Sequence, residues 1–322
     1  MRVLLGIDGG GTKTECVAAG EDGALIGRGF GGPVNTNFVQ AQTARRSLLD
    51  SIDGALGACP PDAGPVLRVV MGGPMRRALA EEVIGQRLPG VPLEMAGEGV
   101  LVLAAGDVLD AGIALIAGTG SMAYGARAGR DPVTVGGWGT LMGDEGSAFD
   151  LGQEALRAVA HAADGRGPET ALTGAVLTWA GVAAPRDLPS VVYRPEHPPD
   201  RTRIASLGEM VTRCADRGDP VAAVILARAA DALFLHVRTV AEILDFDTAD
   251  SFVVVGSGGV LRARGRVLGR LIERTASSYP QARVVVPRET AAAGGAALAL
   301  RAGGFWSAET RRRLLDAAEG ES

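Results

Sequence analysis

The chain has 322 residues, of which 47% are hydrophobic and 21% are charged. This balance excludes wholesale disorder and leaves enough length for two ordinary domains with large cores. The formal net charge of -5 argues against a general nucleic-acid-binding surface. We find no run of about 18 apolar residues, so we expect no transmembrane helix and no membrane partner.

The cysteines and histidines give no sign of a metal site. Cys16, Cys59 and Cys214 lack the paired spacings of zinc or iron–sulfur centres, and the three histidines lack metal-ligand spacing. Scattered cysteines fit a reducing cytoplasm, which is the compartment we expect. The apolar segment Met1–Ile7 is only as long as a strand and meets Asp8 at once, so we expect no secretory signal.

The first third of the chain begins as a meander of three strands. Alternating or continuous apolar residues predict strands, whereas apolar residues every three to four positions predict helices. The predicted strands are 2–8, 15–19, 24–29, 66–71 and 91–95, with a turn at Glu21-Asp22-Gly23, and the predicted helices are 40–56, 75–84 and 99–105.

The pattern of strand, glycine turn and strand then starts again at residue 112. The predicted strands are 112–117, 122–127, 133–135, 252–255 and 283–286, with a turn at 129–131, and the predicted helices are 148–163, 220–244 and 291–300. Asp219 and Pro220 form a good N-cap and first-turn pair. The Pro- and Arg-rich stretch 184–199 is expected to be a surface loop. Two similar α/β halves facing each other across a cleft would explain this repetition.

Glycine turns follow several of these strands. In Asp8-Gly9-Gly10-Gly11-Thr12-Lys13, glycines allow backbone N–H groups to turn inward and hold phosphate oxygens. Asp8 could hold Mg²⁺ through water, and Thr12 and Lys13 (the only lysine) supply a hydroxyl and a positive charge. A tight turn with a capping carboxylate explains one such turn equally well. P-loop and dinucleotide motifs are excluded, because their spacing differs and a helix must follow the glycines.

Two further glycine turns make phosphate binding more specific. Gly118-Thr119-Gly120-Ser121 heads the second half, where it could hold a polyphosphate from the other side. Gly256-Ser257-Gly258-Gly259 ends a later strand, where a nucleoside could lie against backbone.

The sequence resembles the N-acetylglucosamine kinase and BadF-type ATPase family of the sugar-kinase/heat-shock/actin superfamily. The resemblance covers residues 2 to about 300. It is carried by the three glycine turns and by Gly137-Trp138-Gly139 with Gly143-Asp144-Glu145-Gly146-Ser147. It implies an α/β fold of two ribonuclease-H-like domains, the actin-like ATPase fold, with ATP and Mg²⁺ in the interdomain cleft. We expect domains at 1–110 and 111–322, with the last helix free to pack back on the first.

The resemblance also implies roles for individual residues. Asp8 would be the metal ligand, and Glu98 and Asp144 the catalytic candidates. The nucleotide would contact Gly10, Gly11, Thr12, Lys13, Gly118, Thr119, Gly120, Gly256, Ser257 and Gly258. The sugar would contact Asn35, Asn37, Glu98, Gly120 and Asp144.

Simpler interpretations exist for several of these residues. Asn35 and Asn37 could be turn formers after Pro33, and Asp144 could cap the helix that starts near Ser147. Trp138 could fill the core as well as contact a sugar. Glu145 could be only a solvated or capping charge.

The sequence departs from the family at the expected base. Glu98 stands where the family has an aspartate that takes the proton of the attacking hydroxyl. A glutamate can do the same transfer, but its extra methylene moves the carboxylate, and such displacements are costly in rate unless the backbone compensates. If Glu98 is not the base, Asp144 is the next candidate. Met122, where some relatives carry a polar residue, also departs from the pattern.

The expected function is ATP-dependent phosphorylation of an amino sugar, N-acetylglucosamine or glucosamine, at O6. The expected partners are therefore ATP and a small sugar, in the cytoplasm, and relatives are often homodimers. One alternative is an ATPase that drives a protein partner, but none of the three cysteines lies in a suitable glycine–cysteine turn for an iron–sulfur cluster. A sugar or nucleotide sensor without turnover is the third possibility.

Overall fold

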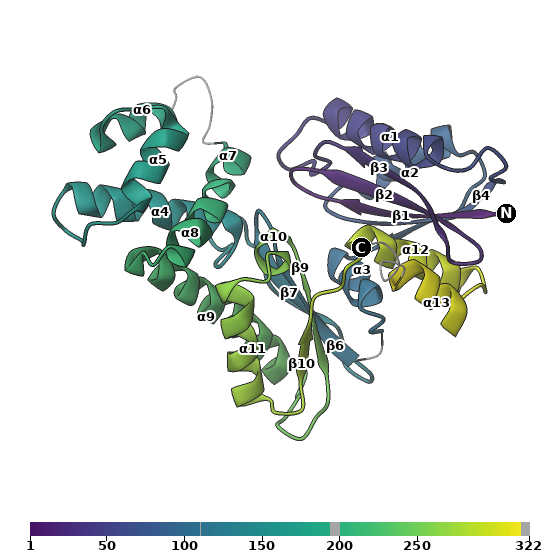
Figure 1. Cartoon of the computed structure of the whole chain (residues 1–322). Coiled ribbons are helices and arrows are strands. Elements are labelled where there is room, and N and C mark those ends of the chain that lie inside the picture. The colour runs from purple at the N-terminus through teal and green to yellow at the C-terminus, as the bar shows by residue number, and fades with distance from the viewer. Residues whose placement is uncertain (110, 194–199, 317–322) are drawn as a thin grey trace. The chain divides into compact units, whose positions relative to one another are not determined.

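The computed structural model describes residues 1–109, 111–193 and 200–316. The chain divides into two compact units. Unit 1 comprises Met1–Gly112 and the chain from Val285 onward, and unit 2 comprises Ile113–Val284. Each unit is built on its own five-stranded sheet (Figure 1).

Unit 1 has the sheet order β3-β2-β1-β4-β5. The central strand β1 is antiparallel to β2 and parallel to β4, and β4 is parallel to β5. Its strands are β1 (Val3–Gly9), β2 (Thr14–Gly20), β3 (Leu25–Gly31), β4 (Val66–Gly72) and β5 (Leu93–Ala96). Its helices are α1 (Ala41–Gly57), α2 (Arg77–Arg87), α3 (Glu98–Ala105), α12 (Ala291–Ala302) and α13 (Ala308–Leu315).

Helix α12 packs tightly in unit 1. It contacts both β1 and α3. A Cβ on Gly6 of β1 would lie 2.1 Å from the carbonyl oxygen of Ala292, so only glycine allows this approach. Arg28 on β3 adds a polar tie, since it donates to Glu15 Oε1 at 2.7 Å and to Glu289 Oε2 at 2.6 Å. Residues from Val285 belong to unit 1, whereas the expected second domain was 111–322 with its last helix packing back on the first.

Unit 2 has the sheet order β10-β9-β6-β7-β8. Its strands are β6 (Ala111–Ala117), β7 (Ser121–Arg127), β8 (Val133–Gly136), β9 (Val253–Ser257) and β10 (Arg283–Val285). Its helices are α4 (Ala148–Ala163), α5 (Leu172–Ala180), α6 (Leu188–Val192), α7 (Arg201–Ala205), α8 (Leu207–Asp216), α9 (Pro220–Ile243), α10 (Gly259–Arg262) and α11 (Arg266–Ser278), with a 3₁₀ turn η1 (Pro185–Asp187).

The two sheets have the same strand order. Replacing β1 to β5 by β6 to β10 in the order of unit 1 gives the order of unit 2. The expected repetition of strand, glycine turn and strand is therefore confirmed, and the predicted turns close with positive φ at Gly23 and Gly129. The units differ in what connects the third strand to the fourth. In unit 1 the single helix α1 lies between β3 and β4, whereas in unit 2 helices α4 to α9 lie between β8 and β9 (Figure 1).

Helices α1, α2, α3, α4, α9 and α12 were predicted from the sequence, whereas α5 to α8, α10, α11 and α13 were not. The predicted helix 148–163 is α4, and Asp219 caps α9 by accepting the N–H of Ala222. The expected surface loop 184–199 is wrong over 185–192, where η1 and α6 form, because Pro185 and Pro189 stand at first-turn positions that suit proline. Residues 194–199 lie outside the described residues.

Helix α9 is the longest in unit 2. Its most apolar window has a mean hydropathy of 1.6, so length and composition alone would let it cross a membrane. Half of that window is buried, and α9 contacts α8, α11 and β7. Buried core helices have the same composition, so the packing within unit 2 accounts for its apolar character.

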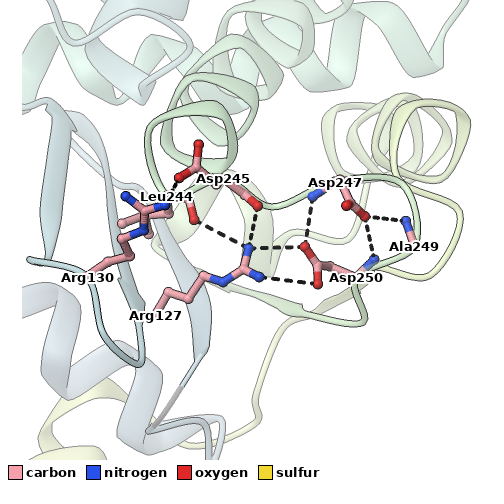
Figure 2. A network of polar contacts seen from close by, with 7 residues as sticks. All are labelled: Arg127, Arg130, Leu244, Asp245, Asp247, Ala249 and Asp250. Atoms are coloured by element: carbon pink, nitrogen blue, oxygen red, sulfur yellow. Dashed lines mark hydrogen bonds and ion pairs between the residues drawn. The ribbon is translucent and has the colours of Figure 1, made fainter.

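A polar network joins the end of β7 to the connection between α9 and β9 (Figure 2). Arg127 donates to Asp250 Oδ2 at 3.0 Å, and Asp250 also accepts the N–H of Asp247 at 2.9 Å. Arg130 in the β7–β8 turn pairs with Asp245. These contacts fix the start of β9 relative to β7 within unit 2.

Candidate active site

The first group of candidate residues lies at the carboxyl edge of the unit 1 sheet. Asp8 pairs in register with Gly72 of β4, and Gly72 pairs with Ala96 of β5. Because β1, β4 and β5 are parallel, their carboxyl ends meet at one edge. Asp8 near the end of β1 and Glu98 at the start of α3 therefore lie close together.

The proximity of these carboxylates changes the acidity of Glu98. Glu98 is the first residue of α3 and is half-buried. Burial, and then the negative charge of Asp8, raise the pKa of Glu98 from its usual 4.5 to about 8. A carboxylate with a pKa near neutrality can accept a proton from a substrate and later release it.

The first glycine turn joins β1 to β2 beside this pair. The N–H of Gly10 donates to the carbonyl of Lys13 at 2.8 Å, which closes the turn. Gly11 and Lys13 at its tip are exposed, and Thr12 is half-buried. The N–H of Val34 donates to the carbonyl of Gly10 at 3.1 Å, which holds the Pro33–Asn37 loop against the turn.

Asn35 and Asn37 lie in that adjoining loop. The Oδ1 of Asn35 accepts the N–H of Asn37 at 3.0 Å, which is an Asx turn, and Asn37 is exposed. The turn-forming role is therefore the one that the side-chain oxygen Oδ1 of Asn35 has in the structure. The side-chain amide can donate from its nitrogen in addition.

The second and third glycine turns meet at one edge of unit 2. In the second, the N–H of Gly118 donates to the carbonyl of Gly120 at 2.9 Å. In the third, Gly258 has φ +93°, and a Cβ there would lie 2.3 Å from the carbonyl carbon of Ala117. Only glycine permits this approach, so Gly256–Gly258 lies directly against the Gly118 turn.

The carboxylate of Asp144 packs against the Gly118 turn and accepts a hydrogen bond from it. Asp144 is 4% exposed and has φ +66°, a conformation that few residues other than glycine adopt. Its Oδ1 accepts the N–H of Ser121 at 3.1 Å, and its Oδ2 accepts from Arg201 Nη2 at 3.0 Å. Burial raises the pKa of Asp144, whereas the Ser121 N–H and Arg201 oppose that rise.

The capping interpretation of Asp144 is wrong. Ser147 is the N-cap of α4, since its side chain accepts the N–H of Asp150. The Asp144 carboxylate instead makes the two contacts with Ser121 and Arg201. Arg201 has no signal near position 144 in the sequence, because 57 residues separate the two partners.

The neighbouring loop contains two further surprises. Trp138 is 69% exposed, so the interpretation that it fills the core is wrong. Glu145 Oε2 lies 3.8 Å from Nε2 of the buried His236, which the sequence did not single out. Burial lowers the pKa of His236, and Glu145 and then Asp144 oppose that change.

The donor groups present decide whether the chain can hold a metal ion. Among residues 1–109, 111–193 and 200–316, no cluster of three or more His, Cys, Asp or Glu side chains forms a metal site. Mg²⁺ in phosphate-handling sites needs only one or two carboxylates, since water and phosphate supply its other oxygens. Asp8 with its neighbour Glu98 fits that requirement.

Several known proteins are similar to this chain over most of its length. An N-acetylmuramic acid/N-acetylglucosamine kinase of Clostridium acetobutylicum is 29% identical over 93% of this chain and 98% of its own. An N-acetyl-D-glucosamine kinase of Dictyostelium discoideum is 27% identical over 92% of this chain and 98% of its own. A candidate N-acetylglucosamine kinase of Chromobacterium violaceum has a crystal structure with a TM-score of 0.71, at 28% identity over 93% of this chain and 99% of that one.

These likenesses extend over nearly the whole chain. The fold is the two-domain actin-like ATPase fold, as expected from the resemblance. The model of the BadF/BadG/BcrA/BcrD ATPase family matches residues 5–299. The chain belongs to the BadF/BadG/BcrA/BcrD ATPase family.

Proposed function

We propose that the chain is an ATP-dependent kinase that phosphorylates an amino sugar, N-acetylglucosamine or glucosamine, at O6. One observation carries this proposal: Asp8 and Glu98 lie together at a sheet edge beside a glycine turn. A kinase needs one carboxylate near the metal-bound phosphates and one near the acceptor hydroxyl. The names of the relatives from C. acetobutylicum and D. discoideum support an amino sugar as acceptor.

The glycine turns would hold the nucleotide. Backbone N–H groups and hydroxyls of the two hairpin turns are suited to phosphate oxygens, and the third turn is suited to the nucleoside. The proposed nucleotide contacts are Gly10, Gly11, Thr12, Lys13, Gly118, Thr119, Gly120, Gly256, Ser257 and Gly258.

Asp8 would hold Mg²⁺ at the phosphates. The ion would neutralise charge on the β- and γ-phosphates during transfer. Asp8 contributes a hard oxygen ligand from a rigid central strand, which fixes where the phosphates are held.

Glu98 would act as the general base. Its carboxylate accepts the proton of the sugar hydroxyl while the hydroxyl oxygen attacks the γ-phosphorus, and the bond from that phosphorus to the bridging oxygen of ADP breaks. Asn35, Asn37, Gly120 and Asp144 would bind the other groups of the sugar. Asp144 would be the second candidate for the base, although its contacts with Ser121 and Arg201 suit binding better.

The test is ADP release by the purified protein with ATP, Mg²⁺ and a panel of hexoses, hexosamines and N-acetylmuramic acid. We expect release that depends on an amino sugar, with a 6-phosphate as product. Release that does not depend on sugar would support a partner-driven ATPase, and nucleotide binding without release would support a sensor. Either outcome would contradict the kinase proposal.

The position of the cysteines favours the kinase over the partner-driven ATPase. Cys16 and Cys214 are buried in β2 and α8, and Cys59 is half-buried after α1. Cys16 and Cys214 are therefore shielded from any surface where two subunits could share a cluster. With ATP and a small sugar as its ligands, the enzyme is proposed to act in the cytoplasm, and a homodimer is the proposed assembly.

A further inference from the structure

The Asp144 carboxylate is the centre of a small buried assembly in unit 2. A Cβ on Gly120 would lie 2.6 Å from Asp144 Oδ1, so the carboxylate packs directly on the Gly118–Ser121 turn. Ser121 is held twice, because its N–H donates to Asp144 Oδ1 and its Oγ donates to the Glu145 carbonyl at 2.7 Å. The start of β7 is thus fixed by two consecutive residues of the neighbouring loop.

Arg201 reaches this assembly from the first residue of α7. Its Nη2 donates to Asp144 Oδ2 at 3.0 Å, and the two side chains are 29% and 5% exposed. Such a pair is shielded from water on the carboxylate side, unlike the many exposed ion pairs of the surface. The nearby carboxylate of Glu145 repels the Asp144 charge, whereas Arg201 and the Ser121 N–H attract it.

We propose that Arg201 is a positioning residue, which orients Asp144 so that it holds the Gly118–Ser121 turn and presents its remaining lone pairs to the sugar. Each carboxylate oxygen has two lone pairs, and the contacts in the structure use one on each oxygen. A rigid guanidinium fixes the plane of a carboxylate better than water does. The claim that Asp144 faces the sugar rests on the proposed kinase function. The claim that Arg201 fixes Asp144 against the Gly118–Ser121 turn does not.

The inference predicts two separable effects of Arg201→Ala. The Asp144 side chain loses its fixed orientation, so the Ser121 N–H exchanges with solvent faster. If the sugar binds Asp144, the KM for sugar rises and kcat falls, with a combined loss of about 100-fold in kcat/KM, as for other small misplacements. The KM for ATP changes less, because the backbone of the three glycine turns remains.

Two variants on the same helix provide matched comparisons. Arg201→Lys keeps the charge but lacks the planar fork, so we expect partial loss. Arg203→Ala removes an arginine two residues away that stacks on Trp179, with its guanidinium 4.7 Å from the ring centroid. Among the residues that the structure describes, Arg203 makes no hydrogen bond or ion pair with Asp144, and we expect parental exchange and kinetics.

The experiment combines hydrogen exchange of the peptide Gly118–Tyr124 with steady-state kinetics on the full chain. We expect faster exchange in Arg201→Ala, and recovery of both exchange protection and kcat/KM when guanidinium is added at concentrations below those that unfold the protein. Should Arg201→Ala fail to fold, Arg201→Lys and Asp144→Asn give the same comparison.

The outcomes separate this inference from the kinase proposal. Parental exchange and kinetics in Arg201→Ala would overturn the inference even if the chain is a kinase. Faster exchange that guanidinium reverses would support the role of Arg201 at the turn even if no sugar is phosphorylated. Faster exchange spread evenly over unit 2, without rescue, would indicate a general structural role and overturn the inference.

Discussion

In unit 1 the sheet edge brings two carboxylates together, Asp8 and Glu98, whereas in unit 2 the corresponding hairpin rests on one carboxylate, Asp144, that an arginine holds. The strand orders are the same, so topology alone does not decide this difference. Burial, and then the like charge of Asp8, raise the pKa of Glu98 and make its carboxylate a stronger proton acceptor. An opposite charge and a backbone N–H give Asp144 a fixed orientation, which suits binding.

The largest expected effect is on the rate in unit 1. Glu98→Gln keeps the shape of the side chain but cannot accept the proton, so we expect kcat to fall by about 10²- to 10⁴-fold with little change in the binding of MgATP. Rapid-quench kinetics and calorimetry measure the two quantities. Glu94→Gln on the exposed face of β5 is the control, and equal rates in the two variants would remove Glu98 from the mechanism.

Adding a methyl group at the third glycine turn tests how closely this turn packs against the Gly118 turn in unit 2. Gly258→Ala introduces a Cβ 2.3 Å from Ala117 at a positive φ, so we expect a loss of about 1–3 kcal/mol in unfolding free energy and weaker ATP binding. A Cβ on Gly259 meets nothing within 4 Å. Gly259→Ala is therefore the control, and denaturant unfolding of both variants measures the difference. Equal stabilities would contradict the close contact between these turns.

The strand and turn pattern was the part of the fold that the sequence predicted well. Alternation of apolar residues and the glycines after them mark each strand, and Asp219 and Pro220 mark the start of α9. Helix α11 was missed although Val267, Leu271 and Thr275 are buried at a helical spacing. Polar residues of α11 outnumber these buried ones, so the helical spacing of its apolar residues is hard to recognise in the sequence.

The site was predictable where it depends on short segments. Asp8 lies near the end of a predicted strand and the glycine turns follow strands, so their place at a strand end could be inferred, whereas Glu98 was singled out only from the resemblance. Arg201 could not be inferred, since its contact with Asp144 depends on how a distant short helix packs in unit 2. The exposure of Trp138 could not be predicted either, because an aromatic residue between glycines can lie in the core or on the surface.

The acidity of Glu98 also predicts a dependence of stability on pH. A carboxyl whose pKa is higher in the folded state than the unfolded value of 4.5 favours folding when it is protonated, so stability falls as pH rises from 4.5 to about 8. Glu98→Gln removes this effect. We expect its melting temperature to exceed that of the parent at pH 8 and to match it at pH 4.5. An equal difference at both pH values would argue against the raised pKa.

The smallest expected effect concerns the polar network of unit 2 (Figure 2). Arg127 bonds to Asp250 and to the carbonyl of Leu244, whereas Arg130 makes a more exposed pair with Asp245. We expect Arg127→Ala to cost about 1 kcal/mol and Arg130→Ala less than about 0.5 kcal/mol. Urea unfolding measures both, and a larger loss in Arg130→Ala would reverse the order inferred from exposure.

The most direct test of the account follows the labelled γ-phosphate of ATP into N-acetylglucosamine or glucosamine, with the parent chain and Glu98→Gln side by side. We expect labelled sugar 6-phosphate from the parent and almost none from the variant, although both bind MgATP. Label released only as inorganic phosphate, at the same rate in both proteins, would contradict the proposed function.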